Sequence, residues 1–177
     1  MMEKLISTRT IYKGKILDLY KDKVILPSGR ESFREVVRHR GAVAVLPWIN
    51  REVILVKQYR YAVDKYLWEI PAGLKEIGET PVQTAQRELV EETKYFPRKL
   101  EKLVEFYSTP GFSDEIIHIF IATELIEDTS KNADYDEFIE IESFSREKIE
   151  KMILQGKIED AKTLVAINLA IAQNKLN

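Results

Sequence analysis

The chain contains no cysteine and only seven glycines among its 177 residues. Without cysteine it has no disulfide, no thiol nucleophile and no Cys-based zinc site. The sequence also lacks a run of 18 apolar residues, and the segment from Met1 to Ile6 has no apolar signal region. We therefore expect no membrane partner, and we predict a cytoplasmic protein.

An excess of positive charge is also absent, because 27 Lys and Arg residues face 29 Asp and Glu residues. A general nucleic-acid binder needs surplus positive charge to displace phosphate counterions, so no nucleic-acid partner is expected. Apolar residues make up 45% and charged residues 32% of the chain, which is typical of a globular protein. The length suits one domain with a small appendage.

The first forty residues have the pattern of short strands joined by turns. Residues 24–26 and 33–38 are apolar or alternating segments on either side of a Pro-Ser-Gly-Arg turn signal at 27–30. This pattern predicts a small antiparallel β appendage over residues 1–40. The main domain is then expected over residues 41–177.

In the main domain, Thr80 is a good N-cap residue, Pro81 fits the first helical position and Gln83 completes a capping box. Ser145 and Asp160 are expected to cap two later helices. Strands are predicted at residues 41–47, 53–58, 103–107, 116–122 and 138–142. The predicted order along the chain is strands, a central helix, further strands and then helices. This order indicates an α+β fold or an α/β/α sandwich.

The helix that begins at Thr80 carries an unusual acidic face. Glu88 and Glu92 are four residues apart, so their carboxylates lie on one face of the helix, with Glu91 on a neighbouring line. Like charges at this spacing destabilise a helix, whereas Mg²⁺ favours a few hard oxygen ligands and keeps sites for water and phosphates. A single Glu pair is usually only solvated surface.

Further residues at fixed offsets favour a functional site. Arg87 lies beside these carboxylates, and Glu79 precedes the helix. An Arg87–Glu79 ion pair would hold the loop 73–78 against the helix. Gly73 is expected to allow a backbone conformation that a side chain would block.

This stretch resembles the Nudix box, G-x5-E-x7-R-E-U-x-E-E-x-G-U, in which U is a bulky apolar residue. Two positions at the end depart from it: Lys94 replaces the last glycine and Tyr95 occupies the last bulky position, so we expect an altered end to the helix. The matching residues are Gly73, Glu79, Arg87, Glu88, Leu89, Glu91 and Glu92.

The resemblance implies a Nudix-type α/β/α sandwich that hydrolyses nucleoside diphosphates linked to another group. It implies that Glu88, Glu92, the accessory ligand Glu91 and the backbone carbonyl of Ala72 bind Mg²⁺, or Mn²⁺ in its place. Gly73, Glu79 and Arg87 would have supporting roles. The metal would polarise phosphoryl oxygens and activate water.

Three segments outside the box resemble the ADP-ribose pyrophosphatase group of this family. Pro110 lies sixteen positions after Lys94, Gln58-Tyr59-Arg60 precedes the Trp68–Gly73 segment, and residues 136–140 resemble an acidic loop before a late strand. The resemblance predicts hydrolysis of ADP-ribose to AMP and ribose 5-phosphate. Arg60 is expected to bind phosphate bidentately.

The same group implies a catalytic base on the acidic loop. We identify Glu137 as the expected base and Asp136 as the alternative; ordinary solvated positions are the competing interpretation. For the adenine, Leu74 and Phe33 are the candidate contacts. The group also implies a homodimer in which residues 1–40 contribute to dimerisation and substrate binding.

Other functions remain open at this stage. The substrate could be another nucleoside diphosphate sugar or a dinucleotide, such as GDP-mannose or NADH. A non-catalytic Nudix domain that senses ADP-ribose is a further alternative, but such domains typically lose box carboxylates, and this chain keeps them all. His39 and His118 are expected to have structural roles.

Overall fold

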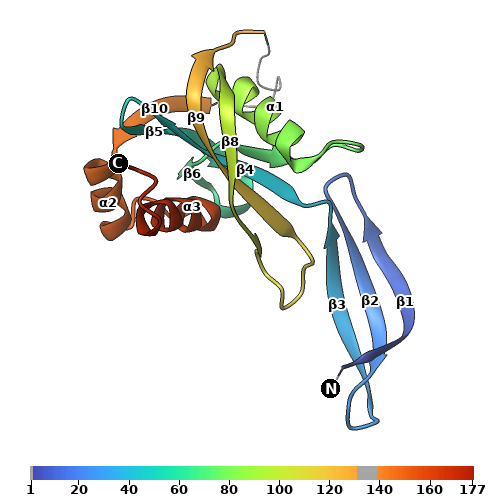
Figure 1. The fold of residues 1–177 in the computed structure, drawn as a ribbon. Coiled ribbons are helices and arrows are strands. Elements are labelled where there is room, and N and C mark those ends of the chain that lie inside the picture. The colour runs from blue at the N-terminus through green and yellow to red at the C-terminus, as the bar shows by residue number, and fades with distance from the viewer. Residues whose placement is uncertain (1, 131–138) are drawn as a thin grey trace. The chain divides into compact units, whose positions relative to one another are not determined.

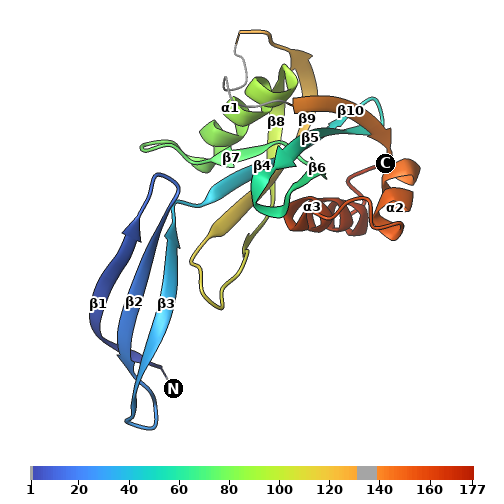
Figure 2. The ribbon, with the colours of Figure 1, turned by 180° about the vertical axis from the view of Figure 1, so that it is seen from behind.

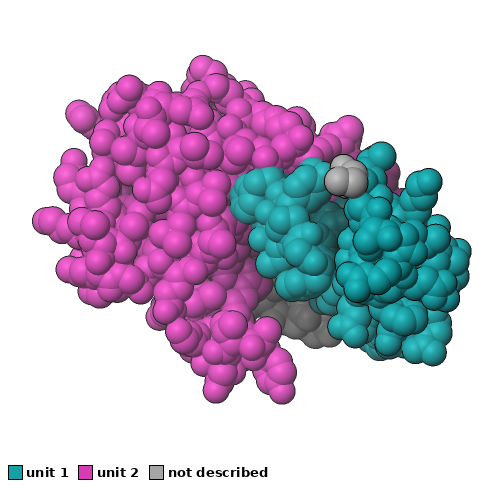
Figure 3. Space-filling view, turned by 90° about the horizontal axis from the view of Figure 1, so that it is seen from below, with its two compact units in different colours: residues 1–42, 106–117 teal, residues 43–105, 118–177 magenta. Residues whose placement is uncertain are grey.

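The computed structural model describes residues 2–130 and 139–177. The chain forms two compact units, residues 1–42 with 106–117 and residues 43–105 with 118–177, which Figure 3 colours separately. No helix within residues 2–130 and 139–177 is long and apolar enough to cross a membrane.

The first unit contains a three-stranded antiparallel sheet in the order β1-β2-β3 (Figure 1). Its strands are β1 (Lys4–Lys13), β2 (Leu17–Ile25) and β3 (Glu31–His39). The predicted turn joins β2 to β3, and Gly29 adopts a φ of +83° there, which favours glycine. The expected appendage is therefore present, although its strands are longer than the sequence indicated.

The segment that contains Pro110 lies against β3 within the first unit. Val37 N–H donates to the Phe112 carbonyl at 2.8 Å, and Asp114 N–H donates to the Val37 carbonyl at 3.2 Å. The Asp114 carboxylate accepts hydrogen bonds from the backbone N–H of His39 at 2.9 Å and from Arg38 at 3.1 Å. The Pro-Gly segment is thus tied to the sheet at several points.

The second unit is built on a mixed sheet with helices on both faces (Figures 1 and 2). Its strands follow the order β10-β5-β4-β9-β8, with β6 paired to β5 and β7 paired to β4. The strands are β4 (Ala42–Ile49), β5 (Glu52–Arg60), β6 (Lys65–Glu69), β7 (Ala72–Leu74), β8 (Tyr95–Tyr107), β9 (Ile116–Glu127) and β10 (Ile139–Ser145). A 3₁₀ turn, Tyr61–Val63, links β5 to β6.

Within the described part of the chain, three helices cover this sheet. Helix α1 (Pro81–Thr93) lies on one face, and α2 (Arg146–Leu154) and α3 (Ala161–Ala172) lie on the other (Figures 1 and 2). The face beneath α1 contains a buried apolar cluster, consisting of Val43, Val45, Ala85, Leu89, Phe120 and Ala122. This arrangement is the α+β, α/β/α sandwich expected from the sequence.

The three predicted helix starts are confirmed. Thr80, Ser145 and Asp160 are the N-caps of α1, α2 and α3, and each side chain accepts a hydrogen bond from a backbone N–H in the first turn. The strand predicted from residue 103 corresponds to β8, which begins eight residues earlier, at Tyr95. Strands β6 and β7 were not predicted.

The end of α1 corrects the expectation of an altered cap. Lys94 adopts the left-handed conformation, with φ 64° and ψ 24°, and its N–H donates to the Val90 carbonyl at 3.0 Å. This is the conformation that glycine usually supplies at a helix end. The Lys94 ammonium also donates to the Glu91 carbonyl at 3.2 Å, which offsets part of the strain.

We expect Lys94→Gly to raise the free energy of unfolding by about 0.5–1 kcal/mol, because glycine adopts this conformation without steric cost. Urea unfolding measures the change. Lys94→Ala is the matched control, since it removes the same side-chain contact but keeps the strain. A Lys94→Gly protein less stable than Lys94→Ala would contradict the argument from strain.

Candidate active site

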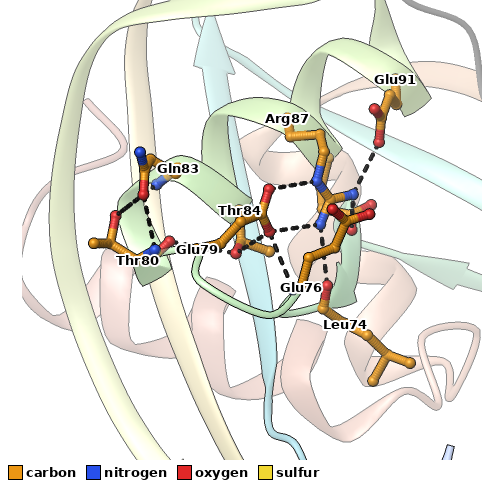
Figure 4. Close-up of polar contacts among 9 residues, drawn as sticks. Leu74, Glu76, Glu79, Thr80, Gln83, Thr84, Arg87 and Glu91 are labelled. Atoms are coloured by element: carbon orange, nitrogen blue, oxygen red, sulfur yellow. Dashed lines mark hydrogen bonds and ion pairs between the residues drawn. The ribbon is translucent and has the colours of Figure 1, made fainter.

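Helix α1 carries the acidic residues predicted to bind metal, and Figure 4 shows its first turn together with Arg87 and Glu91. Its first turn is fixed by the capping box, in which Gln83 N–H donates to Thr80 Oγ1 at 3.3 Å and Thr80 N–H donates to Gln83 Oε1 at 2.9 Å. Leu89 is fully buried in the apolar cluster. Glu88 and Glu92 are also buried, at 8% and 4% exposure, although carboxylates are seldom buried without compensation.

Arg87 connects this helix to the loop before it (Figure 4). Its Nε and Nη2 donate to the two Glu79 oxygens at 2.9 and 3.0 Å, which is the ion pair expected from the sequence. Its Nη2 also donates to the Leu74 carbonyl at 3.0 Å. Its Nη1 donates to Glu88 at 2.6 Å and to Glu91 at 3.0 Å. One guanidinium therefore holds three carboxylates and a β7 carbonyl together.

The ion pair with Arg87 affects the proton affinity of both partners. Hydrogen bonds from the guanidinium lower the pKa of Glu79 to about 2, and the hydrogen bond to Glu79 raises the pKa of Arg87. Thr84 adds a hydroxyl hydrogen bond to Glu79 at 2.8 Å. Glu79 is therefore a permanently ionised anchor at neutral pH, not a proton donor or acceptor.

Gly73 is required for close approach rather than for its backbone conformation. It lies in β7, outside the positive-φ region, and a Cβ at this position would overlap the Glu88 carboxylate. The expected role in permitting an unusual conformation is therefore wrong. The absence of a side chain instead lets Glu88 lie directly against the β7 backbone.

The donor set around Glu88 and Glu92 suits a hard divalent cation. Two buried carboxylates lie one helical turn apart, and that of Glu88 lies against Gly73, the residue after Ala72. Among residues 2–130 and 139–177, no three His, Asp or Glu side chains form a ready-made metal site. Mg²⁺ does not need one, because it binds through one or two carboxylates and completes its shell with water and phosphate oxygens.

Arg60, the expected phosphate ligand, lies at the end of β5 and pairs with Glu69 at the end of β6. Its Nε and Nη2 donate to the two Glu69 oxygens at 2.6 and 2.7 Å. The Arg60 side chain is 39% exposed, whereas that of Glu69 is 2% exposed. Hydrogen bonding to Glu69 raises the pKa of Arg60, and the negative charge of Glu92 adds to this effect. The Arg60 guanidinium thus lies within electrostatic reach of the acidic face.

Sequence reasoning missed Lys162, which contacts Glu69 from the first turn of α3. Its ammonium forms ion pairs with Glu69 and, at 3.0 Å, with Asp160. The two positions Glu69 and Lys162 are 93 residues apart, so no local pattern links them. The sequence signal was a lysine two residues after the predicted cap residue Asp160.

The other predicted site residues are the candidate adenine contacts and the candidate catalytic bases. Leu74 lies in β7 with its carbonyl bound to Arg87. Phe33 belongs to β3 of the first unit, is 56% exposed, and has the Lys21 ammonium 5.0 Å from its ring centre. Asp136 and Glu137 lie outside the described residues.

A pocket of about 310 Å³ borders Arg87 and the exposed side of α1. Most of its lining residues are polar or charged, and Val90 and Phe96 are apolar. The lining residues are Glu79, Gln83, Gln86, Arg87, Val90, Phe96, Asp128 and Ser130.

Comparison with known proteins agrees with this geometry. The NUDIX domain model matches residues 38–166, and the nucleoside diphosphate sugar hydrolase N-terminal domain model matches residues 3–37. The chain is 46% identical to the ADP-ribose pyrophosphatase of Bacillus subtilis (strain 168), over 93% of this chain and 90% of that protein. It is 41% identical to the methanol dehydrogenase activator of Bacillus methanolicus, over 98% and 95% of the two chains.

The fold has a counterpart among solved structures. A crystal structure described as an ADP compounds hydrolase superposes with a TM-score of 0.89 and 18% identity, covering 99% of this chain and 95% of that chain. At this identity the match shows the fold. The family model covers well over half of the chain, and with it the complete acidic helix and its arginine. The protein belongs to the NUDIX family of hydrolases.

Proposed function

We propose that this protein hydrolyses the pyrophosphate of ADP-ribose, with Mg²⁺, to AMP and ribose 5-phosphate. The observation that carries the proposal is the acidic face of α1, where Glu88 and Glu92 are buried and Arg87 holds Glu88 and Glu91. The similarity to a named ADP-ribose pyrophosphatase over nearly the whole chain supports this choice of substrate.

In this proposal Glu88, Glu92, Glu91 and the carbonyl of Ala72 bind the cation. A Mg²⁺ ion held by these groups would supply charge neutralisation at the phosphoryl oxygens and would lower the pKa of a bound water. Arg87 does not contact the substrate. It keeps the carboxylates at fixed positions and, through Leu74 and Glu79, holds the β7–α1 loop to the helix.

Arg60 is the proposed phosphate ligand. Its bond to Glu69 uses the Nε–Nη2 edge of the guanidinium, so the edge that includes Nη1 is directed away from Glu69. A guanidinium with one edge fixed can bind phosphate oxygens through the other at little cost in side-chain entropy. Leu74 and Phe33 remain the proposed adenine contacts.

The protein is also proposed to act as a homodimer through its N-terminal sheet. All ten residues of β1 are exposed in the single chain, and these include Leu5, Ile6, Ile11 and Tyr12. Several large apolar side chains exposed on one strand favour an interaction surface there. The division at residue 40 and the cytoplasmic location stay predictions from the sequence.

The test of this function is product formation from ADP-ribose with and without Mg²⁺, beside GDP-mannose, UDP-glucose and NADH. We expect AMP and ribose 5-phosphate only with the metal, and the fastest turnover with ADP-ribose. Faster turnover of another substrate would keep the Nudix chemistry but replace the substrate. Tight ADP-ribose binding without any turnover would indicate a sensor.

We expect Glu137→Gln to lower kcat by about 10²–10⁴-fold, with a much smaller effect on ADP-ribose binding, because a general base acts in the chemical step. Steady-state kinetics and equilibrium binding separate the two effects. Asp136→Asn is the matched control. If that variant loses kcat and Glu137→Gln does not, then Asp136 is the base.

A further inference from the structure

The buried ion pairs at the end of β6 point to a positioning role for the last helix. Glu69 is 2% exposed and contacts two cations, Arg60 from β5 and Lys162 from α3. One cation would be enough to neutralise a buried carboxylate. The second cation, Lys162, also pairs with Asp160, so it links the Glu69 carboxylate to the start of α3.

Lys162 is itself held by the helix cap. Its side chain is 11% exposed, and its ammonium lies 3.0 Å from Asp160, the N-cap of α3. The other Asp160 oxygen accepts hydrogen bonds from the N–H and the hydroxyl of Thr163, at 2.9 and 2.6 Å. Because Asp160 contacts both the Lys162 ammonium and the first turn of α3, the position of the ammonium is restricted.

The same helix start also binds the backbone next to Glu69. The fully buried Thr163 hydroxyl accepts a hydrogen bond from Ile70 N–H at 2.8 Å. One residue further, the Pro71 carbonyl accepts from Val45 N–H at 2.9 Å. Helix α3 therefore fixes both the side chain of Glu69 and the backbone that leads into Ala72 and Gly73.

The charges explain why two cations share one carboxylate. Burial alone would raise the pKa of Glu69, but the Arg60 hydrogen bonds and the Lys162 charge outweigh it and lower the pKa below its ordinary value. The positive charge of Lys162 offsets part of the negative charge of Glu69. An anion at the outer edge of Arg60 therefore experiences a more positive potential than it would with Glu69 and Arg60 alone.

We propose that Lys162 is a positioning residue for substrate binding, which holds the Glu69 carboxylate so that Arg60 presents its outer edge to the diphosphate of the substrate. This inference rests on the proposed function, because it takes a diphosphate as the anion that Arg60 binds. Lys162 contacts neither the substrate nor the metal and acts through Glu69.

The experiment is a double-mutant cycle with Lys162→Met and Arg60→Ala. In the wild-type background, Lys162→Met is expected to raise KM and the Kd for ADP-ribose about tenfold, with a smaller change in kcat. In the Arg60→Ala background the same substitution should change neither value by more than about twofold. Kd is measured by calorimetry without metal, so that binding is read independently of turnover.

Two controls separate positioning from general destabilisation. Lys157→Met removes an exposed lysine just before α3 and is expected to leave KM and Kd unchanged. Thermal unfolding of all variants shows whether an effect on Kd merely follows stability. Equal effects of Lys162→Met in both backgrounds would overturn the proposal. If wild-type protein binds ADP-ribose and the cycle shows the coupling, but no turnover occurs, then the proposed function fails and the positioning role stands.

Discussion

Replacement of Glu92 by glutamine is expected to lower kcat for ADP-ribose by at least about a thousandfold, a loss of several kcal/mol of metal-assisted catalysis. Glutamine has nearly the same size and shape as glutamate, so the 4% exposed position should stay filled. Its amide lacks the charge that binds a hard cation. The loss should therefore appear in the chemistry rather than in the fold.

A second measurement identifies the cause of this loss. Mg²⁺ that binds only the folded protein raises its melting temperature, and Glu92→Gln should remove most of that increase. Glu142→Gln is the matched control, because Glu142 is exposed on β10 and distant in sequence from the box. Near-normal turnover of Glu92→Gln with Mg²⁺ would eliminate the proposed metal site.

Local signals explain why the helices were predicted well. Each of the caps at Thr80, Ser145 and Asp160 depends on a side chain and a backbone N–H three residues later. Such a signal is complete within one turn. The acidic face of α1 was readable for the same reason, since a four-residue spacing on a helix fixes which side chains share a face.

Non-local contacts explain what the sequence did not reveal. Strand β7 has only three residues, and its conformation depends on pairing with β4 across the sheet. The first residues of β8 follow a left-handed Lys94 and carry a proline, so their pattern did not suggest a strand. The contact between Glu69 and Lys162 joins residues that no local spacing relates.

The sequence correctly identified Gly73 as a residue of the motif, but its physical role in the structure differs from the predicted one. The predicted role was backbone freedom. The structure shows that the Glu88 carboxylate occupies the space of the missing side chain. A contact between a strand and a helix fifteen residues away becomes visible only when both elements are in place.

Gly73→Ala should therefore lower kcat/KM by about a hundredfold or more, because the new methyl group must displace the Glu88 carboxylate from its position. The overlapping atoms are the end of a flexible side chain, so the fold can adjust at modest cost. Glu88 would lose its 2.6 Å contact with Arg87 as it moves. The apparent affinity for Mg²⁺ should fall together with kcat/KM.

Gly156→Ala is the matched control for this substitution. Gly156 has a φ of +66° and open space around it, so alanine there adds strain of about 1 kcal/mol without touching another group. It should lower the melting temperature and leave kcat/KM and Mg²⁺ affinity unchanged. Gly73→Ala should show the opposite combination, a small change in melting temperature and a large loss of activity. Normal activity of Gly73→Ala would mean that catalysis does not depend on Glu88 lying against β7.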